Sequence, residues 1–142
     1  MSRVFTWHVQ DRLGPIDSSG FAEIIGLSLA PRILVGYHVA AHLDINGLVD
    51  QFTVFDSHSG WDNFFADVLH NAGSRFAHKP TCSFIFYSRR IHDIIDEHDE
   101  EDVHFIAAWL ASESIRLFDW YVMTDRSVRS IPADFGISRH WQ

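Results

Sequence analysis

Histidines and carboxylates crowd one short stretch of this 142-residue chain. The segment 91–104, IHDIIDEHDEEDVH, holds three histidines among seven Asp and Glu residues. Imidazoles and carboxylates are common zinc ligands, and a helix here would put His92 and Asp96 on one face, four positions apart. His98 and Asp99 would approach from the next turn, so a metal site near residues 92–99 is one hypothesis. A solvated acidic loop that leads into a helix is the simpler interpretation.

Other residue types that carry chemistry stand apart from one another. The single cysteine, Cys82, lies in the apolar run TCSFIFY, which excludes an intrachain disulfide and indicates a buried, inert thiol. We expect His38 and His42 to be core or edge residues bonded to their neighbours, since nothing nearby completes a ligand set. Ser59 has the spacing of a helix cap, and no Ser-His-Asp arrangement accompanies it.

Composition and charge narrow the class of protein. The length suits one domain, residues 1–142, with a core of ordinary size. No apolar run reaches membrane-spanning length and the first residues lack the pattern of a secretory signal, so we expect a cytoplasmic protein without membrane contact. The formal net charge of -8 makes nucleic acid an unfavourable partner, because such binders depend on clustered Lys and Arg.

The first half of the chain predicts a helix and a hairpin. Residues 20–30 have the pattern of a short helix that ends before a proline. The apolar run 33–43 is typical of a strand covered on both faces, and 48–55 partly alternates. Between them Asn46-Gly47 is a strong hairpin signal, since both positions of such a turn take positive φ.

The second half predicts alternating helices and strands. Within 59–73 apolar residues recur at helical intervals, which predicts a helix. Residues 82–87 have the pattern of a buried strand running parallel to an earlier strand. A second helix begins with Asp99 as its cap, and strands follow over 116–124 and 127–131. The order is therefore β-β-α-β-α-β-β after a short N-terminal helix, which is an α/β fold.

Several segments, in this order and spacing, resemble the RadC-like branch of the JAB/MPN (Mov34/PAD-1) metallohydrolases. The hairpin LDINGLV at 43–49, the helix over 61–73, the helix that follows Asp99, and SIRLFDWYVMTD at 114–125 carry the likeness. It covers about residues 33–136. The resemblance implies a cytidine-deaminase-like, three-layer α/β/α fold with a mixed central sheet.

The residues that would bind zinc in that family are missing here. Active members hold Zn²⁺ with a His-x-His pair at the end of the central strand and an Asp after ten intervening residues. By that alignment Phe86 and Ser88 occupy the histidine positions and Asp99 the carboxylate, and neither Phe nor neutral Ser replaces an imidazole. The family's Pro-Ser-Gly turn is absent, and its general-base glutamate has only Asp50 nearby, in the run LVDQFTV.

The sequence therefore favours a catalytically inactive JAB/MPN-like domain, a pseudoenzyme that acts as a protein-binding or scaffold module. Its partner would be another protein or a second copy, and Arg89, Arg90, Phe105 and Trp109 are the candidate interaction residues. We expect no catalytic residue and no cofactor. The alternative is a metal-dependent hydrolase with zinc at the displaced site near 92–99. A weaker alternative is an acidic mimic of nucleic acid.

Overall fold

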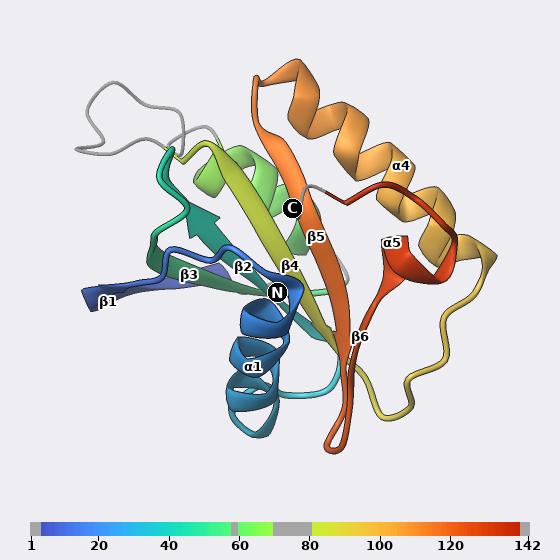
Figure 1. The fold of residues 1–142 in the computed structure, drawn as a ribbon. Helices are drawn as coiled ribbons and strands as arrows, with labels where there is room; N and C mark the ends of the chain where they lie inside the picture. Colours follow the sequence, from blue (N-terminus) through green and yellow to red (C-terminus); the bar gives the residue numbers. More distant parts are fainter. Residues whose placement is uncertain (1–3, 58–59, 70–80, 140–142) are drawn as a thin grey trace.

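A six-stranded mixed β-sheet forms the centre of the protein (Figure 1). The computed structural model describes residues 4–57, 60–69 and 81–139. In space the strands follow the order β1-β3-β2-β4-β5-β6. Their bounds are Val4–Leu13 (β1), Tyr37–Leu43 (β2), Val49–Asp56 (β3), Ser83–Arg89 (β4), Arg116–Met123 (β5) and Val128–Ser130 (β6).

Helices connect the strands and cover both faces of the sheet. The α-helices are Ser19–Leu29 (α1), Gly60–Asn63 (α2), Glu97–Ser112 (α4) and Ile131–Asp134 (α5), with a 3-10 turn at Ala30–Arg32 (η1) and a π-helical turn at Phe64–Leu69 (η2). Within the described ranges, no helix has the length and apolar character needed to cross a membrane.

Strand β4 lies inside the sheet and receives partners of both orientations. It pairs antiparallel with β2 and parallel with β5, whereas β1–β3, β2–β3 and β5–β6 are antiparallel pairs. Since β2 is antiparallel to both of its neighbours, β4 runs in the same direction as β3, as predicted from the helix between them. The fold is α/β, with the predicted hairpin and the predicted helices in their expected order.

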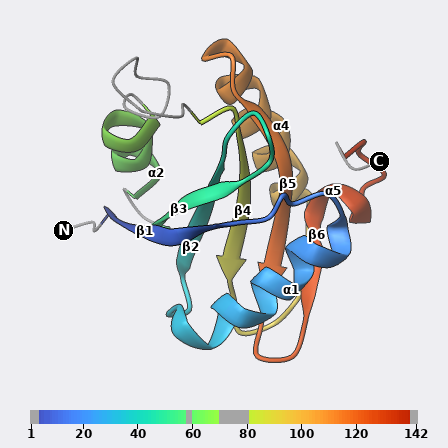
Figure 2. The ribbon, with the colours of Figure 1, turned by 60° about the vertical axis from the view of Figure 1, so that its left-hand side comes forward.

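The alternation of side chains along β4 divides the core into two clusters. Ile85 and Tyr87 point to the face covered by α1, and Phe84 and Phe86 point to the face covered by α4. Figures 1 and 2 show α1 and α4 on opposite sides of the sheet. Since successive residues of a strand face opposite ways, Ser88 shares the α4 face.

The N-terminal part of the chain departs from the prediction. Strand β1 was not predicted, and it pairs with β3 at one edge of the sheet. The strand predicted over 33–43 begins only at Tyr37, because residues 33–36, which follow η1, form a bend and a turn in which Gly36 has φ of 90°.

The hairpin turn between β2 and β3 has another geometry than expected. Only Gly47 has positive φ, and Asn46 does not. The Asp44 carboxylate instead accepts hydrogen bonds from the backbone N–H groups of Asn46 and Leu48, at 2.8 and 3.1 Å. A three-residue loop stabilised by an aspartate therefore replaces the predicted two-residue turn.

One other predicted element ends earlier in the structure, and the ends of another lie outside the described residues. The last strand stops at Ser130, whose side chain caps the short helix α5, so the predicted strand 127–131 is shorter. Helix 59–73 corresponds to α2 and η2 through Leu69. Its predicted cap at Ser59 and its predicted end lie outside the described residues.

Gly26 lies where α1 packs closely on the sheet. A methyl group built there would meet the Tyr87 ring and Val128 at 3.0 Å each. The ring cannot easily move, because it is fully buried and its hydroxyl donates a 2.7 Å hydrogen bond to the Ala22 carbonyl. Glycine at position 26 therefore sets the distance between helix and sheet.

Alanine substitutions at two glycines of α1 test this close packing. At Gly20 the nearest atom would be 4.0 Å away, so Gly20→Ala should be neutral or stabilise by up to about 1 kcal/mol through helix propensity. Gly26→Ala should have a free energy of unfolding about 1–2 kcal/mol below that of Gly20→Ala, because its methyl group overpacks the interface. Urea denaturation measures both, and equal stabilities would contradict the account.

Candidate functional site

A cleft of about 810 Å³ opens on the α4 face, beside the carboxyl end of β4. Its walls come from the start of β2, the end of β4, the loop 90–96, α2 and the first turns of α4. The lining includes His38, Trp61, Ser88, Arg90, Phe105 and Trp120. In an α/β sheet, the carboxyl end of a parallel strand is a common place for ligands to bind.

Sheet register brings His38 and Ser88 together at the floor of this cleft. His38 near the start of β2 is directly opposite Ser88 near the end of β4, in an antiparallel pair. Phe86 is paired with Trp120 of β5, whose indole reaches Ser88 on the same face. These residues, 50 and 32 positions apart in the chain, meet only because three strands align.

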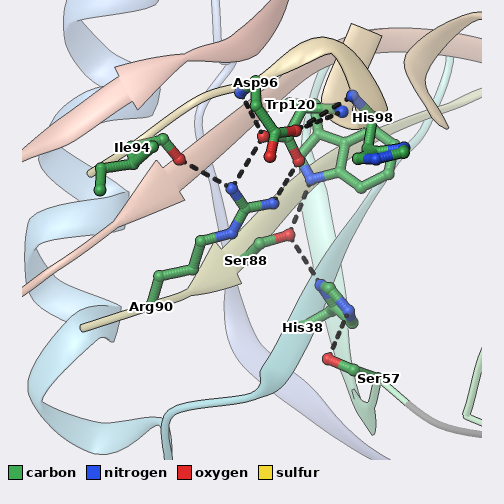
Figure 3. A network of polar contacts seen from close by, with 9 residues as sticks. His38, Ser57, Ser88, Arg90, Ile94, Asp96, His98 and Trp120 are labelled. Atoms are coloured by element: carbon green, nitrogen blue, oxygen red, sulfur yellow. Dashed lines mark hydrogen bonds and ion pairs between the residues drawn. The ribbon is translucent and has the colours of Figure 1, made fainter. Parts of the chain in front are cut away.

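Hydrogen bonds join these side chains into one chain of contacts (Figure 3). The Trp120 indole N–H donates to Ser88 Oγ at 2.8 Å, and Ser88 Oγ lies 2.7 Å from His38 Nδ1. His38 Nε2 lies 3.1 Å from Ser57 Oγ, and Ser57 donates to the Gly36 carbonyl oxygen at 2.5 Å.

The two ends of this network determine where the hydrogens lie. Ser57 has one hydroxyl proton, which it donates to Gly36, so His38 Nε2 must carry a hydrogen and donate it to Ser57. His38 Nδ1 then accepts the proton of Ser88, while the Ser88 oxygen accepts from Trp120. Each of these donors therefore has an acceptor, and His38 is neutral.

The surroundings of His38 favour that neutral form. Burial lowers the pKa of His38 from 6.5 to about 4, and the positive charge of Arg90 lowers it in the same direction. Asp56 acts in the opposite sense, with the smaller effect. At neutral pH His38 is therefore a hydrogen-bonding group and a weak base.

Arg90 and Asp99 form the main ion pair of the cleft. The guanidinium of Arg90 donates to both carboxylate oxygens of Asp99, at 3.0 and 2.5 Å, and to the Ile94 carbonyl at 3.1 Å. Burial raises the pKa of Asp99, but hydrogen bonds from Arg90 and from the Asp96 backbone outweigh it and lower that pKa below 3.8. Asp99 is thus ionised and committed to Arg90.

The start of α4 corrects the prediction that Asp99 caps this helix. Asp96 is the N-cap residue, and its carboxylate accepts from the backbone N–H groups of His98 and Asp99. Asp99 occupies the third helical position and accepts from the Asp96 N–H at 3.0 Å, which completes a capping box. The Asp99 carboxylate therefore binds both the start of the helix and the Arg90 side chain.

The three positions aligned with zinc ligands cannot hold the metal as they stand. Phe86 is fully buried among aromatic side chains of the α4-side core and has no donor atom. Ser88 is 1% exposed and is bonded to His38 and Trp120, and Asp99 is bound by Arg90. This donor set does not fit a zinc ion.

The structure does not bring together the side chains of the displaced metal site predicted near 92–99. Residues 91–96 are not helical, because α4 begins at Glu97, so His92 and Asp96 do not share a helix face. His98 is exposed on the first turn of α4, 3.9 Å from Glu101. Among the residues that the structure describes, no three His, Cys, Asp or Glu side chains converge as a metal site would require.

The predicted interaction residues have different environments. Arg89 is buried, donates to the Ala30 carbonyl at 2.9 Å and pairs with Asp125, so it serves the fold. Phe105 is exposed on the rim of the cleft. Trp109 packs on Phe65 with ring centroids 3.7 Å apart and is only partly exposed, so Phe105 is the more exposed of the two aromatic candidates.

The remaining sequence candidates lie elsewhere. His42 contacts Thr53 at 2.7 Å and Thr81 at 3.2 Å, which confirms it as a bonded core histidine. Cys82 is only partly buried and lines a separate hollow of about 610 Å³, so the prediction of a buried thiol was wrong. The place of Trp120 in the site could not be predicted, since no sequence signal gives the register that sets it beside Ser88.

The lowered pKa of His38 predicts how stability depends on pH. The folded-state pKa of about 4 lies below the ordinary value of 6.5, so the unfolded chain takes up the proton first as pH falls. The contribution of neutral His38 to the free energy of unfolding is complete above about pH 6.5 and falls by about 3 kcal/mol between pH 6.5 and 4. Denaturation of the wild type and of His38→Asn across this range measures it. Parallel pH profiles would contradict the assignment.

No model of a known protein family matches this chain, and no curated protein matches it.

Proposed function

We propose that this chain is a JAB/MPN-like domain without zinc catalysis, which acts by binding another protein in its cleft. The order of elements from β2 to β6 agrees with the resemblance seen in the sequence. Helices on both faces of the mixed sheet are compatible with a three-layer α/β/α arrangement. A hairpin followed by a helix before β4 is also what the resemblance leads one to expect.

One observation carries the proposal: Arg90 occupies the carboxylate that a zinc ion would need. Its two hydrogen bonds to Asp99 satisfy both carboxylate oxygens with the planar geometry that Arg offers. Displacing Arg90 would leave a buried carboxylate unpaired, which is costly without a metal. Together with Phe86 in the histidine position, this argues for a site converted from catalysis to structure.

The rim of the cleft supports binding as the remaining role. Ile91, Ile94 and Phe105 line it and are all largely exposed. Exposed apolar side chains that gather around one hollow are typical of surfaces that contact other proteins. Beneath them, the polar floor is satisfied by its own hydrogen bonds and does not require a ligand to complete it.

The contact between Ser88 and His38 favours a second candidate, a serine hydrolase. The distance of 2.7 Å suits a nucleophile and its base. However, Ser88 is 1% exposed, and a histidine with a pKa of about 4 is a weak base at neutral pH. We therefore favour binding over this activity.

A fluorophosphonate probe separates the two candidates. We expect no covalent labelling of the native chain, because the Ser88 hydroxyl is buried and bonded on both sides. Intact-mass measurement after incubation checks this, with Ser88→Ala as the matched control. Labelling that appears in the wild type and disappears in Ser88→Ala would support the hydrolase and contradict our proposal.

Rebuilding the missing ligands tests the resemblance to the zinc family. The variant Phe86→His, Ser88→His, Arg90→Ala supplies two imidazoles and releases Asp99 from its ion pair. We expect it to bind one zinc ion per chain, and zinc to raise its melting temperature, whereas the wild type should retain no stoichiometric zinc after dialysis. Elemental analysis and thermal denaturation are the measurements.

Adding Asp99→Asn to that variant is the control, and zinc binding should fall sharply. A folded triple variant that takes up no zinc would mean that these positions do not correspond to the family's ligands. Stoichiometric zinc in the wild type would contradict the loss of the site.

A further inference from the structure

The charges left free in the cleft are acidic. Arg89 and Arg90 both line it, but Arg89 is paired with Asp125 and Arg90 with Asp99. Asp62 of α2 and Asp102 of α4 also line it, and neither makes a hydrogen bond or ion pair within the described part of the chain. The cleft therefore has unpaired carboxylates on two walls and its arginines already occupied.

Asp102 is in a setting that a cation would improve. Desolvation raises the pKa of Asp102 and the negative charge of Asp99 raises it further, and these effects outweigh the opposite effect of the Arg90 and His98 charges. A positively charged group placed beside Asp102 would stabilise its ionised form. Asp62 of α2 lines the same hollow, so a cation bound in it is attracted by both carboxylates.

The apolar rim indicates the size of the bound partner. Val35, Ile91, Ile94 and Phe105 are 49%, 69%, 67% and 65% exposed, so they project outward beyond the floor. A small molecule held within the hollow would leave much of this apolar surface in water. A polypeptide segment lying across the opening can cover it, and burial of that surface then contributes to affinity.

We propose that the cleft binds a peptide segment of another protein that carries a Lys or Arg side chain flanked by apolar side chains. The basic group lies between Asp62 and Asp102, and the apolar side chains cover Ile91, Ile94 and Phe105. This inference rests on the proposed binding function and adds the chemistry of the partner. The complementary charges and the apolar rim are independent observations that both favour such a segment.

Selection from a phage-displayed library of random peptides tests this proposal. The immobilised wild-type chain should enrich peptides with Lys or Arg next to apolar residues. On Asp62→Asn, Asp102→Asn the preference for Lys and Arg should disappear, because the attracting carboxylates are gone. The matched control, Asp11→Asn, Asp17→Asn, removes the same charge from exposed positions that do not line the cleft and should keep the preference.

The affinity of one enriched peptide for each variant then measures how much the carboxylates and the apolar rim contribute to binding. Asp62→Asn, Asp102→Asn should weaken it by about fivefold or more at low salt, with a smaller difference at high salt. Ile94→Ser, Phe105→Ser should abolish binding, and both residues are exposed enough for the fold to tolerate the change. Melting temperatures of all the variants verify that they are folded.

The outcomes distinguish the inference from the function on which it rests. Peptides that depend on Ile94 and Phe105 but show no basic preference would overturn the cation site and leave the binding cleft standing. Peptides unaffected by either pair of substitutions, or no enrichment at all, would overturn both. Enrichment of acidic peptides would contradict the assignment of charge.

Discussion

The ion pair between Arg90 and Asp99 is the interaction on which this region depends. It joins the residue after β4 to the first turn of α4, and the same guanidinium holds the Ile94 carbonyl of the intervening loop. Asp99 also belongs to the capping box that starts the helix. The loop, the helix start and the cleft wall are therefore fixed by one carboxylate and one guanidinium.

Beneath this pair, the sheet forms the floor of the cleft, whose polar side chains are hydrogen-bonded to one another and packed on a buried core. His38, Ser88 and Trp120 satisfy one another because β2, β4 and β5 place them side by side on one face. The next residue down on that face, Phe86, belongs to an aromatic core. Polar side chains whose hydrogen bonds are all satisfied, packed on an apolar core, are suited to supporting a binding surface rather than to reacting with a substrate.

Local patterns predicted the elements well, and they failed where long-range geometry decides. The helix α1, the hairpin and the strand β4 follow from periodicity and turn residues, whereas β1 is an edge strand with no comparable signal. The helix was predicted to begin at Asp99, but the cap is Asp96, and the sequence did not separate them because both residues have the right type and lie one turn apart.

The candidate site was less predictable for the same reason. Sequence alone gave Ser88 and His38 separately, since their meeting depends on strand register across 50 positions. The acidic segment after β4 looked like a ligand cluster only on the assumption that it was helical. In the structure the side chains of this segment diverge, and Arg90, just before it, pairs with Asp99, which is the buried carboxylate of the segment.

Diffraction at the zinc absorption edge, from crystals grown with excess zinc, tests the central claim most directly. The account predicts Arg90 on both oxygens of Asp99, Ser88 still bonded to His38, and no anomalous peak in the cleft. A strong anomalous peak within ligand distance of Asp99, with the Arg90 side chain turned away, would contradict it.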